Sequence, residues 1–187
     1  MVVDPGPDPA PEDSPWLSDA EQRVWRAFLQ LTDGLNDLLD RQMQADAGMP
    51  HAYYLILAML SEAPDRSLRM AQLAAAAWAS PSRVSHAVDR LEALGWVVRR
   101  PDERDRRGQV ASLTDDGFAR LESAAPGHAR TVRSVLFDAL TPTQLATFGE
   151  VCDLALGRLG GAADPAAGAA CGTPADSAAE DCTTPEG

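Results

Sequence analysis

The chain has 187 residues and a formal net charge of −12, and 45% of its residues are hydrophobic but only 5% aromatic. This length allows one domain with a full core plus tails, and the Ala-rich composition favours helices over a sheet sandwich. No stretch approaches the roughly 20 consecutive apolar residues of a membrane-spanning helix, and the acidic, Pro-rich first residues do not resemble a secretory signal. The sequence therefore predicts a soluble, cytoplasmic protein with no membrane partner.

Most of the negative charge lies in two segments that are expected to be disordered tails. Residues 1–15 carry four acidic residues and residues 161–187 carry five, with no arginine in either segment. Removing these nine charges from −12 leaves only −3 for residues 16–160, and nine arginines face five acidic residues between 66 and 107. The acidic total is therefore no argument against an anionic partner for this central segment.

The first expected helix starts at Ser18 and runs to about residue 45. Ser18 and Glu21 form a capping-box pattern, in which the hydroxyl and the carboxylate bind the unpaired N–H groups of the first turn. Apolar residues then recur at steps of three and four on two adjoining faces, Val24 and Phe28 among them. So wide an apolar surface predicts contacts both with the chain's own domain and with a second subunit.

Shorter elements are expected next. Residues 50–63 predict a short helix that is buried on most sides, residues 67–70 a brief strand or turn, and residues 70–79 a helix of small side chains. The Ser80-Pro81 pair is typical of an N-cap followed by Pro at the first helical position, so a further helix begins there. Gly95 is suited to end that helix.

A β-hairpin is expected after Gly95. Residues 96–100 and 109–113 alternate apolar and polar side chains around a turn rich in Pro and charge. The side chains expected to secure the strands are Val97, Val98, Val110 and Leu113. Within the turn, Asp102 and Asp105 are expected to act as braces, and arginines outnumber acidic residues over the whole hairpin.

Two further helices complete the chain before the second tail. Thr114 is expected to cap the first of them, and the Pro126-Gly127 pair predicts a kink or a restart rather than one unbroken helix. Thr141 is expected to cap the last helix, and Cys152 lies on its apolar stripe, which is typical of a buried structural thiol rather than a redox sensor. The tail cysteines, Cys171 and Cys182, carry no assigned role.

The order of two short helices, a capped helix and a hairpin predicts a helix-turn-helix with a wing. In residues 81–94 the apolar face, expected to anchor the helix, consists of Val84, Ala87, Val88, Leu91 and Leu94. The opposite face offers polar side chains near the N-terminal end, where a recognition helix meets base edges. The candidate DNA-binding residues are Ser82, Arg83, Ser85, His86 and Arg90 on the helix, and Arg104, Arg106 and Arg107 on the wing. Arg83 is the best candidate for a bidentate guanine contact.

The stretch "SPSRVSHAVDRLEALGWVVRRPDERDRRGQVASLTDDG" resembles the core signature of the MarR family of bacterial transcriptional regulators. The resemblance extends over nearly all of residues 16–160. It implies a mainly α protein with a small β-hairpin, a homodimer whose terminal helices interlock. Residues 16–45 and 115–160 would then be the dimerisation helices, and residues 50–114 the winged-helix DNA-binding lobe.

The same resemblance implies roles for individual residues. The fourth helix would enter the major groove of double-stranded DNA, and the wing arginine, Arg107 by its place in the motif, would enter the minor groove. Asp105 would brace the wing without touching DNA. The best-supported function is thus a repressor that binds a pseudo-palindromic operator and is released by a small-molecule effector.

Other function classes are less well supported by the sequence. No phosphate-binding loop, nucleophile elbow or pair of catalytic carboxylates is recognisable, so no enzymatic function is expected. His51, His86 and His128 are scattered without ligand spacing, so neither a metal nor another cofactor is expected. The alternative is a winged-helix protein–protein module, such as an antirepressor whose acidic tails mimic nucleic acid.

Overall fold

The computed structural model describes residues 15–102, 105 and 108–159. The expected tails therefore lie outside the described residues, apart from residue 15. The elements, in chain order, are α1 (Asp19–Ala47), α2 (His51–Glu62), the short helix η1 (Pro64–Arg66), β1 (Ser67–Arg69), α3 (Met70–Ala76), α4 (Pro81–Ala93), β2 (Val97–Pro101), β3 (Gln109–Leu113), α5 (Asp115–Val132), the π-helical turn η2 (Arg133–Phe137) and α6 (Pro142–Arg158).

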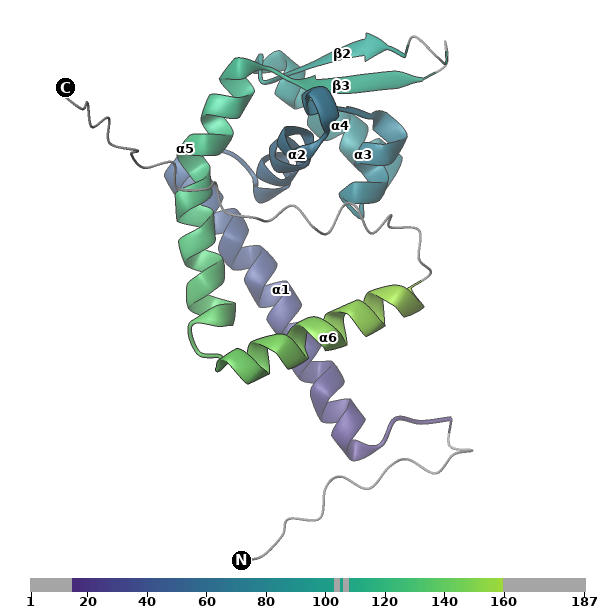
Figure 1. The fold of residues 1–187 in the computed structure, drawn as a ribbon, viewed down its shortest axis with the longest axis vertical. Helices are drawn as coiled ribbons and strands as arrows, with labels where there is room; N and C mark the ends of the chain where they lie inside the picture. The colour runs from purple at the N-terminus through teal and green to yellow at the C-terminus, as the bar shows by residue number, and fades with distance from the viewer. Residues whose placement is uncertain (1–14, 103–104, 106–107, 160–187) are drawn as a thin grey trace, which may run out of the picture.

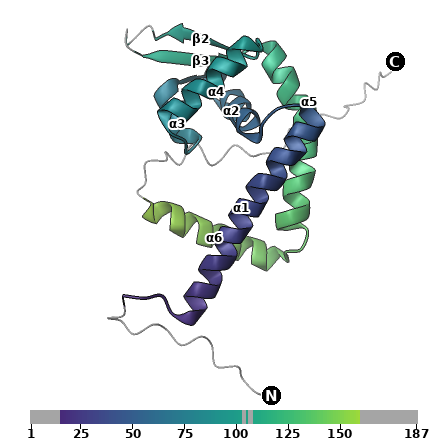
Figure 2. The same cartoon turned by 180° about the vertical axis from the view of Figure 1, so that it is seen from behind.

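These elements form a small lobe on two long helices. Helices α2, α3 and α4 and the β2–β3 hairpin gather at one end of the molecule (Figure 1). Helices α1 and α5 pack against each other and extend away from this lobe, and α6 runs crosswise to α1 in both views (Figure 2). The predicted fold class, mainly α with a winged helix-turn-helix lobe, is confirmed. Among the described residues, no helix is both long and apolar enough to cross a membrane.

The wing is part of a three-stranded antiparallel sheet in the order β1-β3-β2. The predicted hairpin is present as β2 and β3, with Val97 opposite Leu113. The predicted brief strand, β1, pairs with the other edge of β3, with Ser67 opposite Ser112. The hairpin is therefore not a free arm, because β3 lies between two partners. This pairing anchors the base of the wing to the segment that precedes α3.

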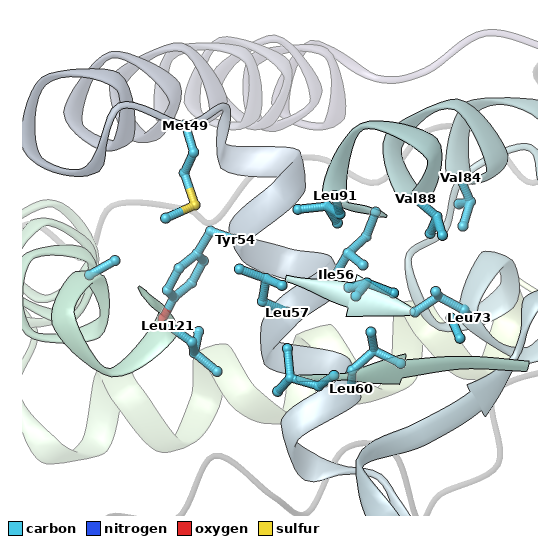
Figure 3. Close-up of a cluster of buried hydrophobic side chains, with 14 of the residues drawn as sticks. Met49, Tyr54, Ile56, Leu57, Leu60, Leu73, Val84, Val88, Leu91 and Leu121 are labelled. Atoms are coloured by element: carbon cyan, nitrogen blue, oxygen red, sulfur yellow. The ribbon is translucent and has the colours of Figure 1, made fainter. Parts of the chain in front are cut away.

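The core of the lobe lies between the three short helices, the sheet and the start of α5 (Figure 3). Residues with no exposed surface include Leu57 and Leu60 of α2, Leu73 of α3, and Val88 and Leu91 of α4. At about 1.5–3 kcal/mol for each buried aliphatic side chain, this contact fixes the orientation of α4 relative to the rest of the lobe.

The predicted N-caps, and the glycine that follows α4, are found at the expected residues. Ser18 and Glu21 form the capping box of α1, and the Ser80, Thr114 and Thr141 side chains each accept a backbone N–H of the following helix. Gly95 follows α4 with φ 77°, a left-handed conformation that favours glycine. Local sequence signals thus determine where these helices begin and where α4 ends.

A kink or a restart is predicted at Pro126, and the restart is wrong. Helix α5 continues through this residue, and the helical geometry changes only at η2. Pro126 lies on the exposed side of the helix, as does Glu122, whose carbonyl loses its partner. Water can bind that carbonyl in place of the missing N–H. The helix is not broken, because its opposite face is packed in the core.

Two side chains expected to be buried are exposed, and a third is only half-buried. Leu94 is 51% exposed because it caps α4, where the chain already turns away from the anchoring face. Val98 is 44% exposed on the outer face of the edge strand β2. Cys152 is half-buried, because α6 has no buried residue within the protomer.

Candidate functional site

Helix α4 presents a polar face whose position is fixed by its buried side. Its N-terminus is set by Ser80, which accepts the N–H of Arg83 at 3.4 Å, and by Pro81 at the first helical position. Val84 and Val88 are buried on the inner side. Of the candidate residues on this helix, Ser82, Arg83, His86 and Arg90 are exposed and Ser85 is half-buried. The structure therefore gathers the five side chains on and beside one outward surface.

Two cations of this surface, Arg83 and Arg90, form no ion pair with another described residue. Within the described part of the chain, neither Arg83 nor Arg90 takes part in an ion pair or a side-chain hydrogen bond. His86 lies 3.9 Å from Asp89, and its side chain remains 86% exposed. An exposed guanidinium group without a carboxylate partner keeps its charge and its donors available for an external acceptor.

Arg99 differs from these residues because its charge is neutralised inside the protein. Its guanidinium group lies 2.6 Å from the Glu92 carboxylate and 2.5 Å from that of Asp89. Burial by itself lowers the pKa of Arg99, but the hydrogen bonds to Glu92 and Asp89 outweigh it and raise the pKa. These contacts join β2 to α4 and hold the hairpin against the helix.

Asp102 anchors the other side of the hairpin. It is only 8% exposed, and its carboxylate lies 2.6 Å from Nε of Arg69 on β1. Its N–H donates to the Gly108 carbonyl at 2.9 Å, and the Gly108 N–H donates to the Asp105 carbonyl at 2.8 Å. The turn is therefore closed by its own backbone and tied to β1 by an ion pair.

The remaining wing candidates cannot be placed on this surface. Arg104, Arg106 and Arg107 lie outside the described residues. Asp105, which is described, is exposed. The strands β2 and β3 lie side by side along one edge of the helical lobe (Figure 1).

Helices α1 and α6 carry apolar side chains that the protomer does not cover. Val24 is 70% exposed and Phe28 50% on α1, and Leu154 is 72% exposed on α6. Trp25 stacks on Phe28 with ring centroids 6.1 Å apart, yet it is 48% exposed. Large apolar side chains exposed in this number are typical of a protein interface.

A histidine pair that the sequence did not indicate lies where α1, α2 and α5 meet. The Nε2 atoms of His51 and His128 are 3.2 Å apart, and the His128 ring stacks on Tyr54 with centroids 4.4 Å apart. The His51 N–H donates to Asp40 at 2.9 Å. The two ring nitrogens lie within hydrogen-bond distance, and the described residues contain no cluster of three or more metal-ligating side chains.

Burial shifts both members of the histidine pair toward the neutral form. Burial, and then repulsion by a charged His51, lower the pKa of His128 from 6.5 to about 4. Burial also lowers the pKa of His51, opposed by the Asp40 charge. A 3.2 Å contact between two ring nitrogens requires one to donate and one to accept, so at least one ring is neutral.

Comparisons with known proteins identify the family. Residues 47–108 match the family model of the MarR family. The crystal structure of Sco3205, a MarR family transcriptional regulator from Streptomyces coelicolor in complex with DNA, has a TM-score of 0.77 to this chain and is 47% identical, covering 81% of this chain and 95% of that one. The chain belongs to the MarR family.

The chain is also similar to other transcriptional regulators. AbsC, a MarR family transcriptional regulator from Streptomyces coelicolor, has a TM-score of 0.73 and is 35% identical, over 78% of this chain and 98% of that one. The HTH-type transcriptional repressor YetL of Bacillus subtilis is 30% identical over 112 residues, which are 58% of this chain and 66% of YetL. These relatives are named as transcriptional regulators, not as enzymes.

Sequence reasoning missed two features of this MarR-family protein. Arg69 was not identified as the partner of Asp102, and His51 and His128 were treated as unrelated. Nothing local signals either contact, because the partners are 33 and 77 residues apart in the chain. Residues 67–70 are predicted as a brief strand or turn without a partner, and pairing them with the hairpin would have placed Arg69 near the wing.

Proposed function

We propose that the protein is a homodimeric DNA-binding repressor that binds a pseudo-palindromic operator and is released by a small ligand. The observation that carries this proposal is the outer face of α4. It presents Arg83 and Arg90, which have no ion-pair partner among the described residues, while Val84 and Val88 lock the opposite face into the core. A helix held in this way can enter a major groove without losing its place in the fold. The DNA complex of the 47% identical Sco3205 supports the same function.

Each candidate residue has a proposed role on DNA. Arg83, near the N-terminal end of α4, would make a bidentate contact to guanine, and Ser82, Ser85 and His86 would contact phosphates or base edges. Arg90 lies further along the same face and would contact the backbone. The wing arginines, Arg104, Arg106 and Arg107, would approach the minor groove, whose negative potential favours arginine.

The braces of the wing follow from described contacts. Asp102 would hold the start of the hairpin turn through its ion pair with Arg69. Asp105 would brace the turn through its carbonyl, which accepts the Gly108 N–H. Neither side chain is proposed to contact DNA, because a carboxylate near phosphates is repelled.

The dimer is proposed from the uncovered apolar surface of the protomer. Residues 16–45 and 115–160 would form the dimerisation helices and residues 50–114 the DNA-binding lobe. Val24 and Phe28 of α1 and Leu154 of α6 are large apolar side chains that are each at least 50% exposed. A two-fold dimer would place its two α4 helices about 34 Å apart, one turn of the duplex. Because the partner is chromosomal DNA, the protein would act in the cytoplasm.

Fluorescence anisotropy tests the proposal. The purified protein is titrated into a labelled duplex from upstream of its own gene and into an unrelated duplex, each at several salt concentrations. We expect specific binding whose affinity falls steeply with salt, because phosphate contacts release counterions. No salt-sensitive binding to any duplex of a panel would refute the repressor and favour the antirepressor, whose acidic character the net charge of −12 supports.

Single variants then locate the interface. Arg83→Ala is expected to cost about 1–3 kcal/mol of specific binding and to relax the preference at one base position. Arg107→Ala is expected to weaken binding to all duplexes. Arg41→Ala is the matched control, because Arg41 is an exposed arginine on α1. Equal losses in Arg83→Ala and Arg41→Ala would show that only net charge matters and that α4 is not the reading helix.

Release and repression need separate measurements. Small metabolites are added to the preformed complex of protein and labelled duplex, and a releasing ligand lowers the anisotropy without unfolding the protein. A reporter gene behind the same duplex distinguishes repression from activation. Higher expression in the presence of the protein would contradict the proposed repressor.

A further inference from the structure

Trp78 occupies a backbone position that helices normally give to glycine. It lies in the turn between α3 and α4 and has φ 47°, in the left-handed region. The Trp78 N–H donates to the Ala75 carbonyl at 3.1 Å, and the Ala79 N–H donates to the Ala74 carbonyl at 3.2 Å. This pair of hydrogen bonds is a Schellman motif, in which the left-handed residue is usually glycine. The motif ends α3 at Ala76, short of the predicted residue 79.

The Trp78 side chain does not offset the strain by packing inside the protein. It is 64% exposed, whereas its neighbours Ala77 and Ala79 pack against the hydrophobic core. A bulky L-residue is disfavoured in the left-handed region because its Cβ crowds the following carbonyl. The fold would therefore be more stable with glycine at this position.

Arg66 also has a left-handed backbone, and its side chain, unlike that of Trp78, makes specific contacts within the chain. Arg66 has φ 50°, but its guanidinium group lies 3.9 Å from the centre of the Phe118 ring and 3.2 Å from Asp115. The Arg66 side chain therefore has contacts within the chain that accompany its left-handed backbone. No such contact is found for Trp78 among the described residues. A strained residue with an exposed aromatic side chain points to a partner outside the chain.

The position of Trp78 indicates what that partner is. The turn leads directly into Ser80, the N-cap of α4, and into the exposed side chains of Ser82 and Arg83. In a helix-turn-helix, the N-terminal end of the recognition helix meets the bases while the preceding helix crosses the phosphate backbone. The turn between them therefore lies at the edge of the groove, where backbone sugars and phosphates pass.

We propose that Trp78 contacts the DNA backbone at this edge, with its indole ring over a deoxyribose and its Nε1–H donating to a phosphate oxygen. The inference rests on the proposed function and extends the reading surface beyond α4 and the wing. Indole suits this contact because it combines an apolar face with one donor and has no acceptor. The contact positions the protein and carries no base preference.

Trp78→Gly tests the proposal by separating stability from binding. We expect the melting temperature to rise by about 2–4 °C, because glycine adopts the left-handed conformation without strain. Affinity for operator and for unrelated duplex is expected to fall roughly tenfold, the scale of one hydrogen bond to a charged group. The slope of log affinity against log salt should not change, because the indole carries no charge.

A conservative variant and the wild type complete the experiment. Trp78→Phe keeps the strained backbone and the ring but lacks the N–H, so its affinity should lie between those of the wild type and Trp78→Gly. Wild-type affinity in Trp78→Gly, or a lower melting temperature in that variant, would overturn the proposal, the latter because Trp78 would then be structural. A loss confined to the operator would also overturn it, since it would indicate a base contact. If the wild type binds no duplex, the proposed function itself fails.

Discussion

Lowering the pH should destabilise the contact between the winged-helix lobe and the long helices, because the His51–His128 pair lies in that contact. These side chains join α2, which belongs to the lobe, to α5, which packs along α1. The pair faces Asp40 of α1 and Tyr54 of α2. Charging both rings places two positive charges at a 3.2 Å contact and desolvates them, so the folded state resists protonation.

The size of the effect follows from the pKa of His128. This pKa is about 4 in the folded protein and 6.5 in an unfolded chain. Between these values the folded state binds fewer protons than the unfolded state, so stability is full above pH 6.5 and falls as the pH drops toward 4. At about 1.4 kcal/mol per pH unit, the loss at pH 5 is at most about 2 kcal/mol. Because His128 is only half-buried, solvent screening reduces the expected loss to about 1 kcal/mol.

Urea unfolding at pH 7.5 and pH 5, at one fixed protein concentration, measures this loss. The His128→Gln variant removes the titrating group, so its stability should change with pH by about 1 kcal/mol less than that of the wild type. His86→Gln is the matched control, because it removes an exposed histidine that lies outside the His51–His128 pair. Carboxylates titrate alike in all three proteins and cancel in the comparison. The same pH dependence in His128→Gln and the wild type would refute the reasoning.

Three further variants test the fold around the proposed interface. Gly117→Ala should lower the free energy of unfolding by about 2–3 kcal/mol, since its Cβ would lie 2.1 Å from the Trp96 carbonyl oxygen, and urea unfolding measures this. Arg69→Ala should cost about 1–3 kcal/mol by leaving the buried Asp102 carboxylate without its ion pair, and adding Asp102→Asn should restore most of that loss. Leu154→Asp should shift the protein from dimer to monomer in sedimentation velocity while its far-UV circular dichroism stays the same. An unchanged sedimentation coefficient would show that α6 is not part of a dimer interface.

Much of the lobe could be predicted from the sequence because its signals are local. A capping residue acts on N–H groups two or three positions away, so Ser80 and Thr114 mark their helix starts regardless of the rest of the fold. The two faces of α4 also follow from spacing alone. Its buried Val84 and Val88 and its exposed Arg83 lie where the helical period places them.

The errors arose where packing outweighs local preference. Pro126 was expected to interrupt α5, but the helix is held by its buried face and only an exposed carbonyl loses its bond. Leu94 was assigned to the anchoring face, but the chain leaves the helix at that residue. Trp78 was counted within a helix, and the structure places it in a left-handed turn that composition does not signal.

The sequence by itself determined the order of the elements, their helix caps, the polar face of α4 and the resemblance to the MarR family. The prediction that Arg104, Arg106 and Arg107 contact DNA rests on the sequence alone, because these residues lie outside the described ones. Only the tertiary structure decided which distant residues meet: β1 beside β3, Arg69 on Asp102, and His51 on His128. The physical reason is the sequence separation over which each interaction acts. Caps and periodicity involve residues a few positions apart, whereas these contacts form only when the helices and the sheet pack together.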